Sequence, residues 1–129
     1  MSEQTNPIRD AIAEAIDENR VILFMKGTPD APSCGFSART SAALQSLGVP
    51  FAAVDILPDP RIRQELTAVS GWPTIPQVFV KGELVGGADI TEELLESGDL
   101  ERRLDEALGA DRERAVKTVA LDLGGVEIR

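Results

Sequence analysis

The chain has 129 residues, 43% of them hydrophobic, and carries a net charge of −9. This length and apolar content suit one folded domain, whereas the negative charge argues against binding nucleic acid, which requires neutralising phosphates. The longest apolar run, Val21–Met25, is far too short to cross a membrane. The N-terminal segment mixes acids into an amphipathic pattern, unlike a secretory signal. A single cysteine excludes a disulfide framework, so we expect a reducing cytoplasm.

Charge is spread unevenly along the chain. Residues 26–81 contain five basic and four acidic side chains, a net charge of +1, so the remainder carries −10. We interpret the acidic flanks as solvated surface helices. The nearly neutral middle is where a small anion could bind.

The first half of the chain alternates between helices and strands. Asn6 followed by Pro7 is a typical helix start, and apolar residues then recur at helical spacing. The run Val21–Met25 predicts a strand buried on both faces. Residues 37–48 predict a helix ended by a glycine, and residues 51–56 predict a second strand.

The second half begins with another helix. Asp59 and Pro60 predict its start, and a glycine predicts its end. Ile62, Leu66 and Val69 have the spacing of residues that face a core.

A hairpin and two helices follow. Residues 77–87 predict two short strands joined by a turn at Lys81. Asp89, with Glu92 three residues later, predicts a capping box that starts a helix. Gly98 ends that helix, and a further helix follows it.

This order of elements predicts an α/β fold of the thioredoxin-like type, a mixed four-stranded sheet flanked by helices. The expected domain comprises residues 1–109. Residues 110–129 form a C-terminal tail, for which a small hairpin and a disordered segment are both open.

The lone cysteine is the first candidate for chemistry. Free cysteines are commonly small buried hydrophobes, but Cys34 lies among proline, serine and glycine residues at the start of a predicted helix. A helix N-terminus lowers the pKa of a thiol, and Lys26 adds positive charge nearby. Thiolate character serves both nucleophilic exchange and metal ligation, so we expect Cys34 to be functional.

The composition limits what this thiol can do. The chain has no histidine, which excludes a Cys–His catalytic pair and a Cys/His zinc site within one chain. An iron–sulfur cluster needs about four ligands, so it would require a second chain and external thiols. A mixed disulfide at Cys34 would find no resolving cysteine in the chain. Both routes require a thiol from outside.

Three sequence blocks resemble the monothiol glutaredoxins of the CGFS type. They are "KGTP…CGFS" within Lys26–Ser37, "WPTIPQVFV" at Trp72–Val80 and "GGAD" at Gly86–Asp89. The blocks stand in the family's order and separation, and the resemblance covers about residues 7–108. Three linked blocks make it far more specific than the CGFS tetrapeptide alone.

The resemblance implies a glutathione site. The Ile75–Pro76 bond would be cis, with the Ile75 backbone pairing with the cysteinyl part of glutathione. Gly87, Ala88 and Asp89 would bind the γ-glutamyl end. Without the resemblance, Pro76 would be an ordinary proline at a strand entry, and the last three residues a plain helix start.

The opposite end of glutathione would be held by two cations. The resemblance assigns the glycyl carboxylate to Lys26 and Arg63, although Arg63 alone would be interpreted as a solvated helix residue. The chain departs from the family at Ala88, where many members carry a cysteine. This excludes an intramolecular dithiol mechanism but should preserve binding, because the position would meet glutathione through its backbone.

The implied function is that of an iron–sulfur cluster carrier. Two chains would hold one [2Fe–2S] cluster through both Cys34 thiolates and two glutathiones, forming a homodimer when the cluster is bound. Expected partners are a BolA-type protein and apo iron–sulfur proteins, with no nucleic acid and no membrane. The alternative is a glutathione-dependent oxidoreductase that deglutathionylates proteins through Cys34. A third possibility is a thioredoxin-like scaffold with an idle thiol.

Overall fold

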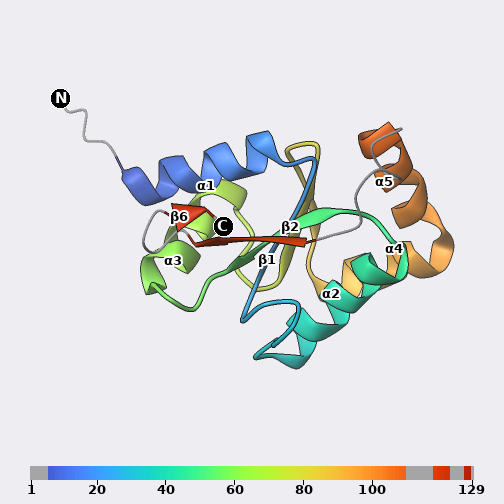
Figure 1. The fold of residues 1–129 in the computed structure, drawn as a ribbon, viewed down its shortest axis with the longest axis horizontal. Helices are drawn as coiled ribbons and strands as arrows, with labels where there is room; N and C mark the ends of the chain where they lie inside the picture. The colour runs from blue at the N-terminus through green and yellow to red at the C-terminus, as the bar shows by residue number, and fades with distance from the viewer. Residues whose placement is uncertain (1–5, 110–117, 123–126, 129) are drawn as a thin grey trace.

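The computed structural model describes residues 6–109 and the path of the chain over residues 118–122 and 127–128. Figure 1 shows how the helices surround the sheet. In chain order the elements are α1 (Pro7–Glu18), β1 (Val21–Met25), α2 (Gly35–Ser46), β2 (Phe51–Asp55), α3 (Pro60–Ser70), β3 (Gln77–Val80), β4 (Glu83–Gly86), α4 (Ala88–Ser97), α5 (Asp99–Leu108), β5 (Thr118–Asp122) and β6 (Glu127–Ile128). The predicted order of helices and strands is confirmed through α5. No helix in this described part is long and apolar enough to span a membrane.

The sheet is mixed, and β1 lies inside it. β1 pairs with β2 in parallel and with β3 antiparallel, while β3 and β4 form the predicted hairpin. Its turn residues, Lys81 and Gly82, both have positive φ, as the tightest hairpin turns require. These four strands and their helices form the predicted thioredoxin-like α/β fold.

Part of the C-terminal tail extends this sheet. β5 pairs with β2 in parallel, in a register running from Phe51 opposite Thr118 to Val54 opposite Leu121. β6 then pairs antiparallel with β5, so the described strands have the order β4-β3-β1-β2-β5-β6. In this order β5 and β6 lie at the edge of the sheet furthest from β4. The rest of the predicted tail 110–129 lies outside the described residues.

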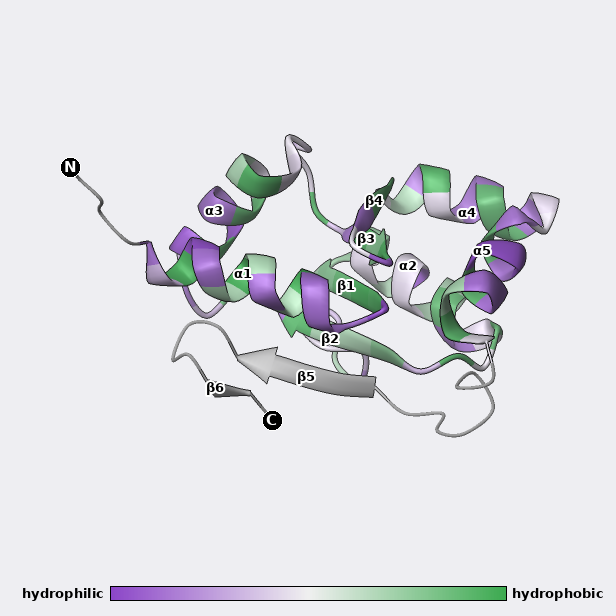
Figure 2. Cartoon of the chain, turned by 90° about the horizontal axis from the view of Figure 1, so that it is seen from above, coloured by the Kyte–Doolittle hydropathy of each residue, from purple (hydrophilic) through white to green (hydrophobic). Residues whose placement is uncertain are grey.

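The core has two halves, one on each face of the sheet. Successive side chains of a strand point to opposite faces, so Phe24 packs with α1 and α3 whereas Leu23 packs with α2 and α5. All five residues of β1 are buried, which confirms the strand predicted to be covered on both sides. On one face Phe24 meets Phe79 edge to face, with ring centroids 5.8 Å apart. Figure 2 shows α1 and α3 on one side of the strands and α2, α4 and α5 on the other.

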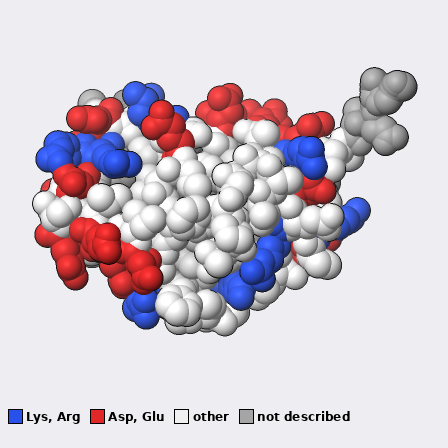
Figure 3. All heavy atoms as spheres, turned by 180° about the vertical axis from the view of Figure 1, so that it is seen from behind, with Lys and Arg blue, Asp and Glu red and all other residues white. Residues whose placement is uncertain are grey.

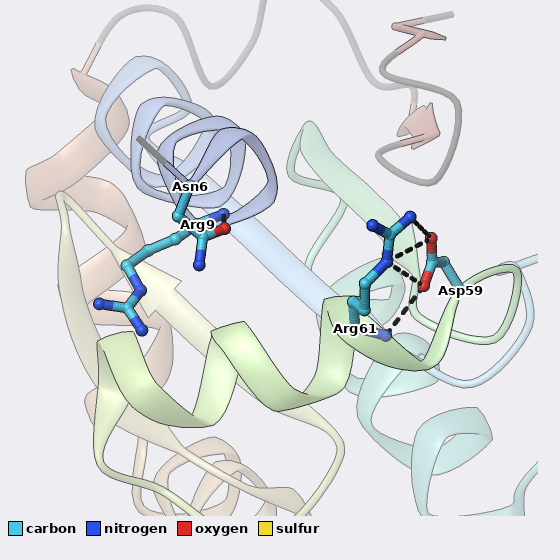
Figure 4. A network of polar contacts seen from close by, with 4 residues as sticks. All are labelled: Asn6, Arg9, Asp59 and Arg61. Carbon is cyan, nitrogen blue, oxygen red and sulfur yellow. Dashed lines mark hydrogen bonds and ion pairs between the residues drawn. The ribbon is translucent and has the colours of Figure 1, made fainter. Parts of the chain in front are cut away.

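Two helix starts are capped as predicted (Figure 4). The side chain of Asn6 accepts a hydrogen bond of 3.0 Å from the Arg9 backbone at the start of α1. Asp59 caps α3 by accepting a 2.9 Å hydrogen bond from the Arg61 backbone, and it also forms an ion pair with the Arg61 guanidinium. These caps satisfy backbone N–H groups that lack partners within the helix.

Two local predictions are wrong. Val69 was expected to face the core, but it lies in the last turn of α3 and is 38% exposed. Asp89 was expected to cap α4, but Gly87 holds the cap position, and Asp89 lies in the first turn. The carbonyl of Gly87 already accepts hydrogen bonds from both the backbone and the hydroxyl of Thr91, so the helix begins before Asp89.

Candidate functional site

A tightly closed loop carries Cys34 from the end of β1 to the start of α2. The backbone of Ser33 donates a 2.9 Å hydrogen bond to the Lys26 carbonyl, and the Gly27 backbone donates one of 2.9 Å to the Asp55 side chain. Gly27 has a φ of +88°, and a Cβ there would lie 2.5 Å from the Ala31 carbonyl oxygen. Only glycine suits both conditions, so this residue fixes the shape of the loop.

Cys34 is the N-cap residue of α2, where backbone N–H groups lack helical partners. Hydrogen bonding from the Ser37 backbone is the largest cause that lowers the pKa of the thiol, partly opposed by desolvation. The Phe36 backbone and the positive charge of Lys26 lower this pKa further. The thiol is only partly buried. Cys34 therefore presents more thiolate than an ordinary cysteine at neutral pH.

A pocket of about 360 Å³ opens beside this loop. It lies where the segment after α3, the first turn of α4 and the start of α2 meet. Its walls are formed by Lys26, Phe36, Arg63, Trp72, Thr74, Ile75, Pro76, Gly87, Ala88, Asp89 and Ile90. The pocket therefore combines a mostly apolar lining with a few charged groups, as small-molecule sites usually do.

All six residues that the family resemblance assigned to glutathione binding line this one pocket. They come from separate segments: Lys26 follows β1, Arg63 belongs to α3, Ile75 precedes β3, and the other three begin α4. The Ile75–Pro76 bond is cis, as expected. Lys26 and Arg63 have no ion-pair partner among the described residues.

An exposed aromatic ring lies two residues from the thiol. Phe36 is 53% exposed, and the Arg39 guanidinium lies over its ring, 4.9 Å from the centroid. Arg39 also forms a 3.0 Å ion pair with Glu92 of α4. These contacts link α2 to α4 beside the pocket.

The surroundings of the pocket are poor in charge. Figure 3 shows the face over β4 and the start of α4, with a broad uncharged area at its centre and most charged side chains around its margin. A basic group inside such an area is screened less by neighbouring charges than one in the acidic flanks.

Sequence reasoning missed four of the lining residues: Phe36, Trp72, Thr74 and Ile90. Each adjoins a predicted site residue or block, so position along the chain was the available signal. Trp72 carried a second signal, because it is the only tryptophan in the chain.

Comparison with known proteins agrees with this geometry. The family model described as Glutaredoxin matches residues 21–85. The chain is similar to a probable monothiol glutaredoxin, GrlA, of Legionella pneumophila, with 54% identity over 89 residues, 69% of this chain and 100% of the relative.

Two solved structures are also similar. One is reduced apo GrxS14 of poplar, with 42% identity and a TM-score of 0.69, covering 78% of this chain and 92% of that one. The other is a glutaredoxin–glutathione complex from buckwheat, with 23% identity and a TM-score of 0.69, covering 78% and 89%, which supports the fold alone. With Cys34 as its only cysteine, the chain belongs to the glutaredoxin family, among the monothiol glutaredoxins.

Proposed function

We propose that the pocket binds glutathione with its thiol directed toward Cys34. The observation that carries this proposal is the convergence in one pocket of the first turn of α4 with two cations, Lys26 and Arg63, that have no ion-pair partner among the described residues. The cations suit the glycyl carboxylate, and the N–H groups that begin α4 suit the γ-glutamyl carboxylate. The cis-proline segment, residues 72–76, offers the Ile75 backbone to the cysteinyl part.

Membership of the glutaredoxin family supports this choice of ligand. The substitution that sets this chain apart, Ala88, does not weaken the proposal. Ala88 is buried at the first position of α4, so its backbone N–H, which every residue except proline supplies, is the group that would contact the ligand.

We further propose that the bound thiol and Cys34 together serve as ligands to an iron–sulfur cluster shared by two chains. Among the described residues no three His, Cys, Asp or Glu side chains gather to hold a metal ion. Cys34 supplies one thiolate, at a partly exposed position with a lowered pKa, which suits a ligand shared across an interface. Two chains and two glutathiones complete the four sulfur ligands of a [2Fe–2S] cluster.

The protein would then carry clusters as cargo between other proteins. Half of the ligands would come from a diffusible tripeptide, so release requires no unfolding of the chain. Its partners would be a second copy of the chain, a BolA-type protein and apo iron–sulfur proteins.

The lowered pKa of Cys34 also favours a second function, deglutathionylation. The Cys34 thiolate would attack the glutathione sulfur of a protein–glutathione disulfide and release the protein thiolate. A second glutathione thiolate would then attack the resulting Cys34–glutathione disulfide, giving oxidised glutathione and restoring Cys34. Steady-state turnover of a glutathionylated protein tests this function.

Anaerobic reconstitution with iron, sulfide and glutathione tests the cluster proposal. We expect a sulfur-to-iron charge-transfer spectrum on a dimer, lost when glutathione is omitted or in Cys34→Ser. A colourless monomer that binds glutathione would overturn the cluster proposal and favour deglutathionylation. A protein that does not bind glutathione would overturn both.

A further inference from the structure

Gln77 is a polar side chain with no exposed surface, placed directly after the cis-proline segment. Its amide nitrogen donates two hydrogen bonds, one of 2.9 Å to the Trp72 carbonyl and one of 3.1 Å to the Thr74 carbonyl. One buried side chain therefore satisfies two carbonyls of the segment that forms one wall of the pocket. The amide oxygen is buried and has no hydrogen-bond partner among the described residues, so the side chain carries a cost here that an apolar residue would avoid.

The same wall touches the opposite wall through Trp72. A Cβ built on Gly87 would lie 3.3 Å from the indole Nε1 of Trp72 and 3.3 Å from the Pro76 carbonyl oxygen. The indole nitrogen is buried and has no hydrogen-bond partner among the described residues. The ring therefore lies beside Gly87 with no hydrogen bond from its nitrogen to a described residue. Its position depends on where the backbone of Trp72 is fixed.

We propose that Gln77 is a positioning residue for the glutathione site. Its amide fixes the backbone of residues 72–74, and this backbone determines where the Trp72 ring lies against Gly87. The position of the ring in turn determines the width of the pocket between the cis-proline segment and α4. This inference rests on the proposed glutathione function and adds a specific residue to it. Gln77 does not line the pocket, so it acts through the wall rather than on the ligand.

The physical basis is preorganisation. If the amide is removed, two carbonyls of the segment lose their partner, and the backbone must shift to recover hydrogen bonds elsewhere or in water. Glutathione would then have to restore the wall as it binds, and that ordering reduces affinity.

The chain provides a direct reporter of this wall. Trp72 is its only tryptophan, and it has no tyrosine, so indole fluorescence comes from the pocket wall alone. A purely structural role for Gln77 would lower stability without moving this signal in the folded protein.

The test compares wild type with Gln77→Met, which keeps a long side chain but removes the amide. Val78→Ala is the matched control, because Val78 is the next residue of β3, fully buried but on the opposite face of the sheet. For Gln77→Met we expect a changed Trp72 emission without ligand and about tenfold weaker glutathione binding by calorimetry. Val78→Ala should lose stability but keep both readouts. Unchanged emission with wild-type affinity in Gln77→Met would overturn the inference.

Gln77→Glu keeps the test decisive if the methionine variant does not fold. Burial raises the pKa of the introduced carboxyl, and its protonated form can donate one hydrogen bond whereas the carboxylate can donate none. Relative to wild type at the same pH, glutathione binding by this variant should therefore recover as pH falls from about 8 to about 5. A ratio of variant to wild-type glutathione affinity that does not change with pH would overturn the inference. Failure of wild type itself to bind glutathione would overturn the proposed function instead.

Discussion

The hydroxyl oxygen of Ser37 accepts a hydrogen bond of 3.0 Å from the backbone N–H of Lys26. This bond joins the first turn of α2 to the end of β1, and Ser37 has no exposed surface. The two residues that it connects both lower the pKa of Cys34, one through hydrogen bonds and the other through its charge. The contact therefore fixes the electrostatic surroundings of the thiol.

Loss of either side chain should make Cys34 less acidic. Ser37→Ala removes a hydroxyl that can bond to the thiolate, and Lys26→Gln removes a positive charge, so the pKa of Cys34 should rise in both variants. It should stay below the ordinary thiol value, because the backbone N–H groups of Ser37 and Phe36 remain. The pH dependence of iodoacetamide alkylation measures this pKa. A wild-type midpoint at or above the ordinary value would contradict the prediction.

Adding a methyl group at Gly87 should damage the pocket. The Cβ of Gly87→Ala would approach the Pro76 carbonyl and the Trp72 ring to 3.3 Å, and one of these neighbours is backbone. We expect a loss of about 1 kcal/mol or more in the free energy of unfolding, with weaker glutathione binding. Urea denaturation and calorimetry check the two effects. For stability the control is Gly35→Ala, whose methyl group would meet nothing within 4 Å.

The ion pair at the start of α3 should make stability depend on acid pH. Hydrogen bonding from the Arg61 side chain lowers the pKa of Asp59 to about 2. A lowered pKa stabilises the fold above the unfolded-state value of about 3.9, and this contribution disappears as pH falls toward 2. Asp59→Asn keeps the cap but loses the charge, so it should melt below wild type at neutral pH.

The acid titration of this difference is the deciding measurement. The gap in Tm between wild type and Asp59→Asn should be small, because the pair is at the surface, and should close between about pH 4 and pH 2. Arg61→Gln should add nothing in the Asp59→Asn background. A gap that persists at the lowest pH would show that the charge is not its source.

Removal of residues 110–129 should lower stability without affecting the pocket. β2 would lose its parallel partner β5 along four paired residues, which we expect to cost about 1–3 kcal/mol. Folding should survive, because the Legionella relative is matched over its whole length by 89 residues of this chain. Glutathione affinity should stay at the wild-type value, since the lining residues fall within 26–90. Equal urea midpoints for the two proteins would contradict a stabilising role for β5.

The order of elements through α5 followed from local patterns. Val21–Met25 is a short run of entirely apolar residues, which is the pattern of a strand covered on both faces. The pairing of β5 with β2 could not be predicted, because alternation identifies a strand but not the edge it joins. Asp89 shows a similar limit, since a capping pattern does not exclude an earlier start when glycines precede it.

Local sequence patterns predicted less of the candidate site than of the fold. Lys26, Arg63 and Ala88 come from three separate segments, and only the family resemblance brought them together before the structure did. The role of Cys34 was different, because its place at a helix start was visible in the sequence. Trp72 and Phe36 were missed because hydrophobic periodicity identifies residues that face a core. It does not identify residues that line a pocket.

The five residues of β1 contribute to both halves of the core. Neither half can separate from the sheet without removing packing from the other, so the two should lose their structure in one cooperative transition. The loop and helix that surround Cys34 come directly after this shared strand in the chain. The acidity of the thiol is thus coupled to the global folding equilibrium, and the lowered pKa of Cys34 is lost when either half of the core unfolds.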